Sequence, residues 1–171
     1  MDNFKIDDDM IGRVGEAIFQ SYCDQNGIVY TPLCNLKERV DRHVDNSMFL
    51  AKFNFRKQSF LQYLPDEFIP EIESVTLSTR SDSPESSVFD FFAIDIKNST
   101  PNRAKGSGAG SRYLKIPREA YHWAEIKTGE IHLSEQQERK ILEYKLPVII
   151  YNVLNPFSKA VSLVKINARQ L

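Results

Sequence analysis

A carboxylate and an ammonium group lie two residues apart in the stretch "HWAEIKTGEIHLSEQQERKI". Glu125 and Lys127 alternate with the apolar residues Trp123, Ala124 and Ile126, as in a buried strand that leads into a helix. A lone charged pair in a strand is ordinarily part of an exposed sheet face. Here the neighbouring strand-like segments are apolar, and a buried carboxylate needs a metal ion or a cation as its partner. The pair is therefore a candidate for chemistry.

A second carboxylate, Asp90, lies near the start of the apolar segment "VFDFFAIDI", which we predict to be a strand over 88–96. If this strand pairs with the one that carries Glu125, the two acids come together. Two carboxylates at one site repel each other unless a positive charge lies between them. Mg²⁺ prefers one or two carboxylates with water and phosphate oxygens. Together with Lys127, the acids are a candidate metal site for phosphodiester hydrolysis.

The elements that must position these residues follow from the hydrophobic pattern. A helix is predicted over "DDDMIGRVGEAIFQSYCDQNG", and strands over "IVYTPL", "YHWAEIK", "VIIYNVL" and "AVSLVKI". Ser134 and Gln137 have the spacing of a capping box at the start of another helix. The charged stretch 36–64 has a pattern that is helical in places, and we expect its aromatic residues to pack a helix. We predict one α/β domain over 1–171, with a mixed central β-sheet flanked by helices and an inserted, partly helical segment at about 36–87.

The segments "FDFFAID" and "AEIKTG", joined by a linker, resemble the PD-(D/E)xK nuclease superfamily, which has the restriction-endonuclease-like fold. "VGEAIFQSYCDQNG" is similar to the first helix of that superfamily, and "EIKTGEIHLSEQQ" is similar to the stretch after the lysine in resolvase-like and restriction-like members. The resemblance implies the catalytic residues Asp90, Glu125, Lys127 and Glu16. It implies that Asp90, Glu125 and Ile126 bind Mg²⁺, with Mn²⁺ as a substitute.

Two of these assignments have alternatives. Asp95 lies in the same strand-like segment as Asp90, but its odd offset places it on the opposite strand face. Asp90 is preferred because it lies near the strand start, as the aspartate of the superfamily does. Glu16 is equally well explained as a surface glutamate beside the apolar face of the first helix.

A polar linker over 97–118 joins the two strands that carry the acids. It contains six basic residues and no acidic residue, although the net charge of the whole chain is −1. Its charge is explained either by a solvated loop or by phosphate contacts near the site. The candidate nucleic-acid-binding residues are Arg103, Lys105, Arg112, Lys115 and Arg118.

The composition is that of an ordinary globular domain, with 42% hydrophobic and 26% charged residues in 171. Two cysteines without a CxxC pair disfavour a structural zinc site. With no long apolar run, we expect a soluble cytoplasmic protein that has no membrane partner and no small-molecule cofactor.

The leading hypothesis is a metal-dependent endonuclease that hydrolyses phosphodiester bonds in DNA. The first alternative is a catalytically inactive PD-(D/E)xK-like module that binds nucleic acid or protein, and the second is an unrelated α/β interaction module. The resemblance also implies a homodimer, because many double-strand cutters use two sites.

Overall fold

A computed structural model of the chain describes residues 8–33, 41–42, 48–65, 68–76, 88–98, 100–102, 113–115, 118–155, 158, 160–169 and 171. The described helices are α1 (Asp8–Asn26), α3 (Ile69–Thr76) and α4 (Glu135–Tyr144), with short 3₁₀ turns η2 (Ile96–Asn98) and η3 (Arg118–Ala120). The strands of the main sheet are β1 (Ile28–Pro32), β2 (Asp41–Arg42), β3 (Met48–Phe55), β4 (Gln58–Pro65), β5 (Phe91–Asp95), β8 (Tyr121–Lys127), β9 (Val148–Asn155) and β10 (Ala160–Ile166).

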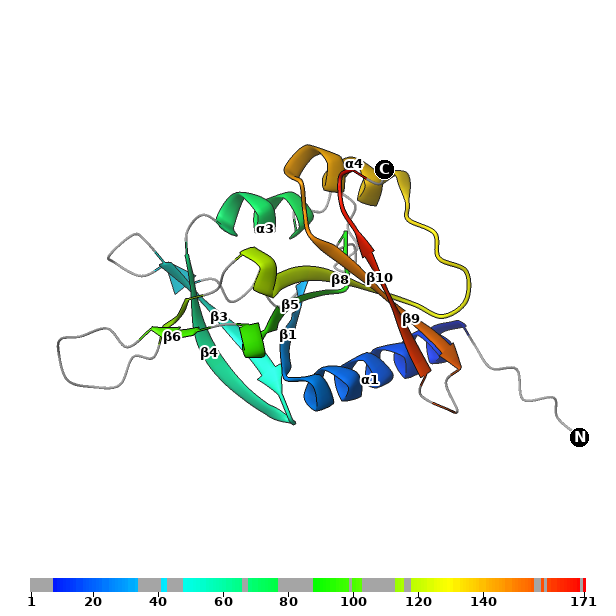
Figure 1. Cartoon of the computed structure of the whole chain (residues 1–171), viewed down its shortest axis with the longest axis horizontal. Coiled ribbons are helices and arrows are strands. Elements are labelled where there is room, and N and C mark those ends of the chain that lie inside the picture. Colours follow the sequence, from blue (N-terminus) through cyan, green and yellow to red (C-terminus); the bar gives the residue numbers. More distant parts are fainter. Residues whose placement is uncertain are drawn as a thin grey trace, which may run out of the picture.

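The centre of the fold is an eight-stranded mixed sheet with the order β10-β9-β8-β5-β1-β3-β2, in which β4 also pairs with β3 (Figure 1). Strands β8 and β9 run parallel, and the other described neighbours run antiparallel. A parallel pair needs a crossover connection, which α4 supplies. A separate two-stranded sheet consists of β6 (Thr100–Asn102) and β7 (Tyr113–Lys115). The prediction of an α/β domain with a mixed central sheet is confirmed.

Helices cover both faces of this sheet, α1 on one side and α3 with α4 on the other (Figure 1). Phe19 and Cys23 of α1 pack in one apolar cluster with Ala124 of β8. Trp123, the preceding residue of β8, packs in the second cluster with Ile141 of α4. Neighbouring residues of β8 therefore face opposite layers, as strand alternation predicts. Strand β8 therefore lies between two buried apolar layers, and its charged residues stand at its end.

The expectation of helix within 36–64 is wrong where the structure describes this stretch, because β3 and β4 form a β-hairpin. Ala51 and Phe53 are buried at alternate positions of β3, whereas Lys52 is half-buried. The hairpin turn consists of Arg56 and Lys57, whose φ angles are 47° and 62°. Such turns ordinarily use Asn or Gly. The sequence therefore carries no ordinary turn signal at the position where the chain reverses. The partly helical character expected of 36–87 is confined to α3 among its described residues.

The other predicted elements are observed with small shifts at their ends. The strand predicted over 88–96 is β5, which begins after Asp90. Ser134 is the N-cap of α4 and accepts a hydrogen bond from Gln137 N, while the Gln137 side chain accepts one from Ser134 N, which confirms the capping box. Helix α4 ends at Tyr144, and its C-cap residue Lys145 has a left-handed φ of 51°.

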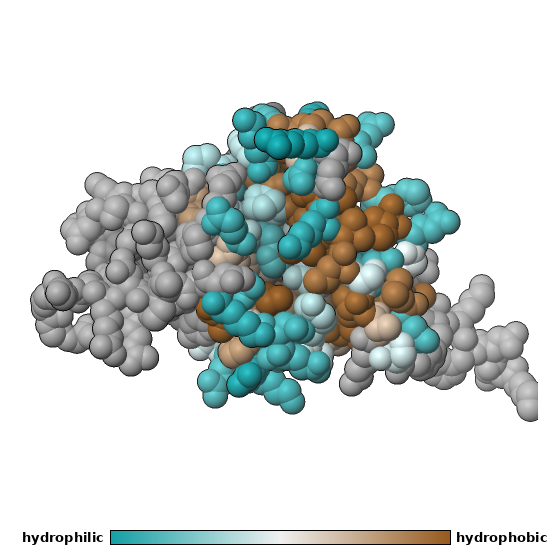
Figure 2. Space-filling view, in the orientation of Figure 1, coloured by the Kyte–Doolittle hydropathy of each residue, from teal (hydrophilic) through white to brown (hydrophobic). Residues whose placement is uncertain are grey.

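No described helix is both long enough and apolar enough to cross a membrane. Apolar side chains are visible on the molecular surface in the region of β9 and β10 (Figure 2), where Leu154 and Leu163 are exposed. Whether two copies of the chain associate stays a prediction.

Candidate functional site

Strands β5 and β8 bring Asp90 and the Glu125–Lys127 segment together. The residue after Asp90, Phe91, pairs with Ala124, and Asp90 N donates a hydrogen bond to Ala124 O over 3.1 Å. The side chain of Asp90 is fixed as well, because its Oδ2 accepts a hydrogen bond from Ile126 N over 2.8 Å. The two acids predicted from the sequence to meet across a strand pair do meet, at the start of β5 and the end of β8.

Glu125 is buried, with only 6% of its surface exposed, and its partner is Lys127. The distance from Lys127 Nζ to Glu125 Oε1 is 2.7 Å. The Lys127 side chain is 28% exposed, so the ammonium group neutralises the buried acid while remaining at the surface of the site. The need for a cation next to a buried carboxylate explains the spacing of two residues, which puts both side chains on the same face of β8.

The pKa of Asp90 is raised from 3.8 to about 7. Burial is the main cause, and the negative charge of Glu125 is the second. The hydrogen bond from Ile126 N and the charge of Lys127 oppose this shift, whereas Glu16 adds to it. Burial makes the ionised form of Asp90 costly, and the charge of Glu125 beside it adds to that cost. Such a pair attracts a proton or a cation.

Glu16 is exposed on α1, and its charge acts on Asp90 from the helix side of the site. The close approach of α1 to the end of β8 depends on Gly15. A Cβ atom at this position would lie 3.0 Å from Cγ2 of Thr128 and 3.2 Å from Cγ2 of Ile126. The "GE" pair of the first helix thus has a physical explanation: glycine permits the contact, and the glutamate lies next to it.

Gln137 has a second contact that its capping role did not indicate. Its Nε2 donates a hydrogen bond to Val88 O over 2.8 Å, and Gln137 is buried. Helix α4 therefore holds the segment that leads into Asp90. The sequence predicted Gln137 chiefly as a capping residue, and the resemblance to the superfamily, in which a serine or glutamine of this helix lies near the site, made proximity to the site a minor alternative.

Asp95, the alternative to Asp90, lies at the opposite end of β5. Its Oδ1 accepts a hydrogen bond from Lys97 N over 3.0 Å. The aspartate that lies beside the Glu125–Lys127 segment is Asp90. Asp90 and Asp95 are five residues apart, which is about 17 Å along a strand. The linker 97–118 connects this far end of β5 to the start of β8. Its two anchor points are therefore distant from the acids.

The predicted nucleic-acid-binding residues of the linker are placed only in part. Arg103, Lys105 and Arg112 lie outside the described residues. Lys115 belongs to β7 and Arg118 to η3, where the structure describes the backbone. Their proposed contacts with nucleic acid stay predictions.

The oxygen atoms of the site bear on whether it could hold the expected Mg²⁺ ion. Among the residues that the structure describes, no three or more His, Cys, Asp or Glu residues form a group that could hold a metal ion. Asp90 and Glu125 nevertheless offer two carboxylates, one of them with a raised pKa, next to the main chain of Ile126. Mg²⁺ is commonly bound by one or two carboxylates while it keeps several waters. The residues present therefore fit Mg²⁺ through their oxygen chemistry.

Comparison of the chain with models of known protein families, with curated proteins and with solved structures found no match. The function must therefore be argued from the site.

Proposed function

We propose that the protein is a metal-dependent nuclease that hydrolyses phosphodiester bonds in DNA, built on a restriction-endonuclease-like core. The observation that carries this proposal is the meeting of Asp90 and Glu125 beside Lys127, where the pKa of Asp90 is raised to about 7. The elements around the site are the helix α1, the strands β1, β5 and β8, which pair antiparallel, and the helix α4, which leads to the parallel strand β9. The segments that resemble the superfamily lie on α1, on β5, and on β8 with the start of α4.

Each residue of the site has a distinct task in this proposal. Asp90, Glu125 and the carbonyl group of Ile126 hold Mg²⁺, which when bound supplies neutralising charge for the phosphate and makes a nearby water more acidic. Lys127 stabilises the negative charge that develops on the phosphate. Glu16 lies on the helix side of the same acids and adds negative charge that favours cation binding.

The test is incubation of the protein with plasmid, single-stranded and branched DNA in Mg²⁺ or Mn²⁺. Cleavage by the wild type should disappear in EDTA and in Lys127→Ala, and it should persist in Lys165→Ala, which removes an exposed lysine of β10. Mn²⁺ should also raise the melting temperature of the wild type more than that of Glu125→Gln, because a ligand that binds the folded state stabilises it. DNA binding without cleavage in either metal would replace the proposal with the inactive binding module. Equal cleavage by Lys127→Ala would exclude this site.

A further inference from the structure

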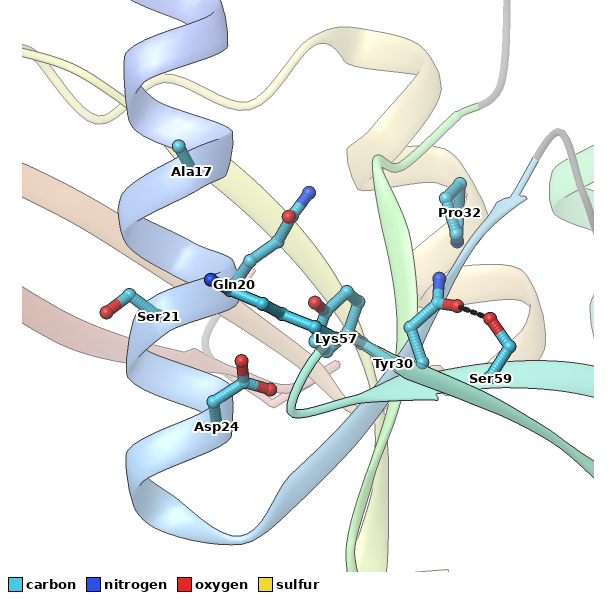
Figure 3. Close-up of a pocket in the computed structure, with 9 residues that line it drawn as sticks. Ala17, Gln20, Ser21, Asp24, Tyr30, Pro32, Lys57 and Ser59 are labelled. Carbon is cyan, nitrogen blue, oxygen red and sulfur yellow. Dashed lines mark hydrogen bonds between the residues drawn. The ribbon is translucent and has the colours of Figure 1, made fainter.

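A pocket of about 390 Å³ lies between α1 and the β1–β3–β4 part of the sheet (Figure 3). Its helix wall includes Gln20 and Ser21, and its sheet wall includes Tyr30 and Asn54. Lys57 of the hairpin turn also lines it, and in Figure 3 its side chain extends toward α1. This volume is in the range of small-ligand sites. The lining is rich in amide and hydroxyl groups and contains a cation.

The pocket begins next to the candidate site on both walls. On the helix, Ala17 lines the pocket and directly follows Glu16. On the sheet, Pro32 lines the pocket and pairs with Phe91, the residue after Asp90. From there the pocket follows α1 from Ala17 to Asp24, over about 10 Å at ~1.5 Å per helical residue. That length corresponds to about three stacked nucleotides at ~3.4 Å each.

The hairpin turn places Lys57 at the far end of the pocket at a conformational cost. Arg56 and Lys57 both have positive φ angles, which non-glycine residues adopt only where the surroundings hold them. Here Arg56 N donates a hydrogen bond to Asp24 Oδ1 over 2.6 Å, which holds the turn against α1. Asp24 is the acid of the pocket wall, and this bond engages its carboxylate. The charged residues of the lining are therefore one cation, Lys57, and one acid, Asp24.

The donors of the sheet wall are also organised. Ser59 Oγ donates to Asn54 Oδ1 over 2.8 Å, drawn as a dashed line in Figure 3. With its oxygen used in this way, Asn54 presents its amide Nδ2 group as a donor. Amide donors and a lysine ammonium suit phosphate and sugar oxygens, which make most of the contacts that position a nucleic acid without reading its sequence.

We propose that this pocket binds the sugar-phosphate backbone of the substrate strand on one side of the scissile phosphate, with Lys57 contacting a phosphate. This inference rests on the proposed nuclease function and assigns to the β3–β4 hairpin the task of holding the strand that leaves the site. The strand passes from the acids along α1 and β1 toward the hairpin turn.

Binding of a labelled single-stranded DNA oligonucleotide, measured by fluorescence anisotropy in EDTA, tests the pocket without cleavage. Lys57→Asn removes the cation but keeps a residue that tolerates positive φ, so the turn should persist. We expect it to weaken binding about threefold to tenfold and to reduce the slope of log Kd against log salt by ~0.7, the value for one phosphate contact on a single strand. Gln20→Glu, which puts a negative charge on the helix wall, should weaken binding as well.

The matched controls are Lys165→Asn on β10 and Gln136→Glu on α4, which make the same changes at exposed positions away from the pocket. If Lys57→Asn and Gln20→Glu bind DNA as their controls do, the pocket is not a strand-binding site, even if Mg²⁺-dependent cleavage is observed. If both weaken binding while the wild type cleaves nothing, the pocket assignment stands and the nuclease proposal fails. Should Lys57→Asn melt well below the wild type, Lys57→Gly supplies the same loss of charge in the turn.

Discussion

The carboxylate of Asp90 accepts a hydrogen bond from the backbone N–H of Ile126, the residue between Glu125 and Lys127, over 2.8 Å. Through this bond the first acid of the site is fixed by the main chain of the strand that carries the second acid and the lysine. Movement of β5 against β8 would therefore disturb all three side chains together.

Asp90→Asn should reduce kcat/KM for DNA cleavage by at least about 100-fold, because it removes a proposed metal ligand.

In EDTA the same variant should be more stable than the wild type at pH 8. Because the pKa of Asp90 is raised from 3.8 to about 7 in the folded protein, protonated Asp90 stabilises the fold and ionised Asp90 does not. This contribution to the free energy of unfolding is complete below pH 3.8 and is lost as the pH rises through 7. The difference in melting temperature between variant and wild type should therefore shrink toward pH 4. Asp95→Asn, at the other end of β5, is the control, and a pH-independent difference for Asp90→Asn would contradict the burial argument.

Acid should destabilise the protein through His122. This residue is buried, its Nε2 lies 2.8 Å from the Tyr151 hydroxyl, and burial lowers its pKa from 6.5 to about 4. A lowered pKa means that the folded state favours neutral His122. The contribution of His122 to the free energy of unfolding is therefore present above pH 6.5 and is lost as the pH falls through 4. His122→Gln keeps a polar partner for Tyr151 without this titration. Its melting temperature relative to the wild type should rise as the pH is lowered from 7 to 4. A constant difference over this range would show that His122 does not titrate as described.

Gly15→Ala tests the close approach of α1 to the site. Alanine is favoured over glycine in a helix by about 1 kcal/mol, and at Gly12, where an added Cβ meets no atom within 4 Å, we expect that gain. At Gly15 the Cβ would crowd Thr128 Cγ2 at 3.0 Å, so Gly15→Ala should melt at a lower temperature than Gly12→Ala. Cleavage should fall in Gly15→Ala alone, because the displaced helix carries Glu16.

Thr128→Ser removes the methyl group that the new Cβ meets. The double variant Gly15→Ala/Thr128→Ser should regain part of both stability and cleavage. If Gly15→Ala behaves like Gly12→Ala in both measurements, the contact does not position Glu16.

Gln137→Ala should destabilise the fold more than Ser134→Ala. Loss of the N-cap alone costs about 1 kcal/mol. Loss of Gln137 also leaves the buried carbonyl of Val88 without its 2.8 Å hydrogen bond, which adds about 1–3 kcal/mol. Thermal or urea unfolding gives the comparison. Cleavage should fall in Gln137→Ala and persist in Ser134→Ala, since only the former frees the segment before Asp90. Equal losses of activity in both variants would mean that the helix end, and not the Val88 contact, matters to the site.

Much of the site could be predicted because its signals are local. Alternation along a strand is enough to put Glu125 and Lys127 on one face, and the capping box of Ser134 and Gln137 marks the helix that follows. The meeting of Asp90 with Glu125 required one further assumption, that their strands pair, which the apolar character of both segments favoured. The β3–β4 hairpin was missed because Arg56 and Lys57 replace the usual turn residues. Its strands mix aromatic and charged residues in a pattern that was read as helical in places.

By itself the sequence determined the α/β class, the order of most elements and the residue types that could perform phosphodiester chemistry. Only the tertiary structure decided that Asp90 rather than Asp95 lies beside Glu125, because antiparallel pairing of β5 and β8 places the start of β5 next to the end of β8. It also decided that Gln137 contacts Val88 and that Lys57 lines a pocket with Gln20. These relationships join residues far apart in the chain, and no local propensity records them, because their energies arise from packing and desolvation that exist only when the elements meet.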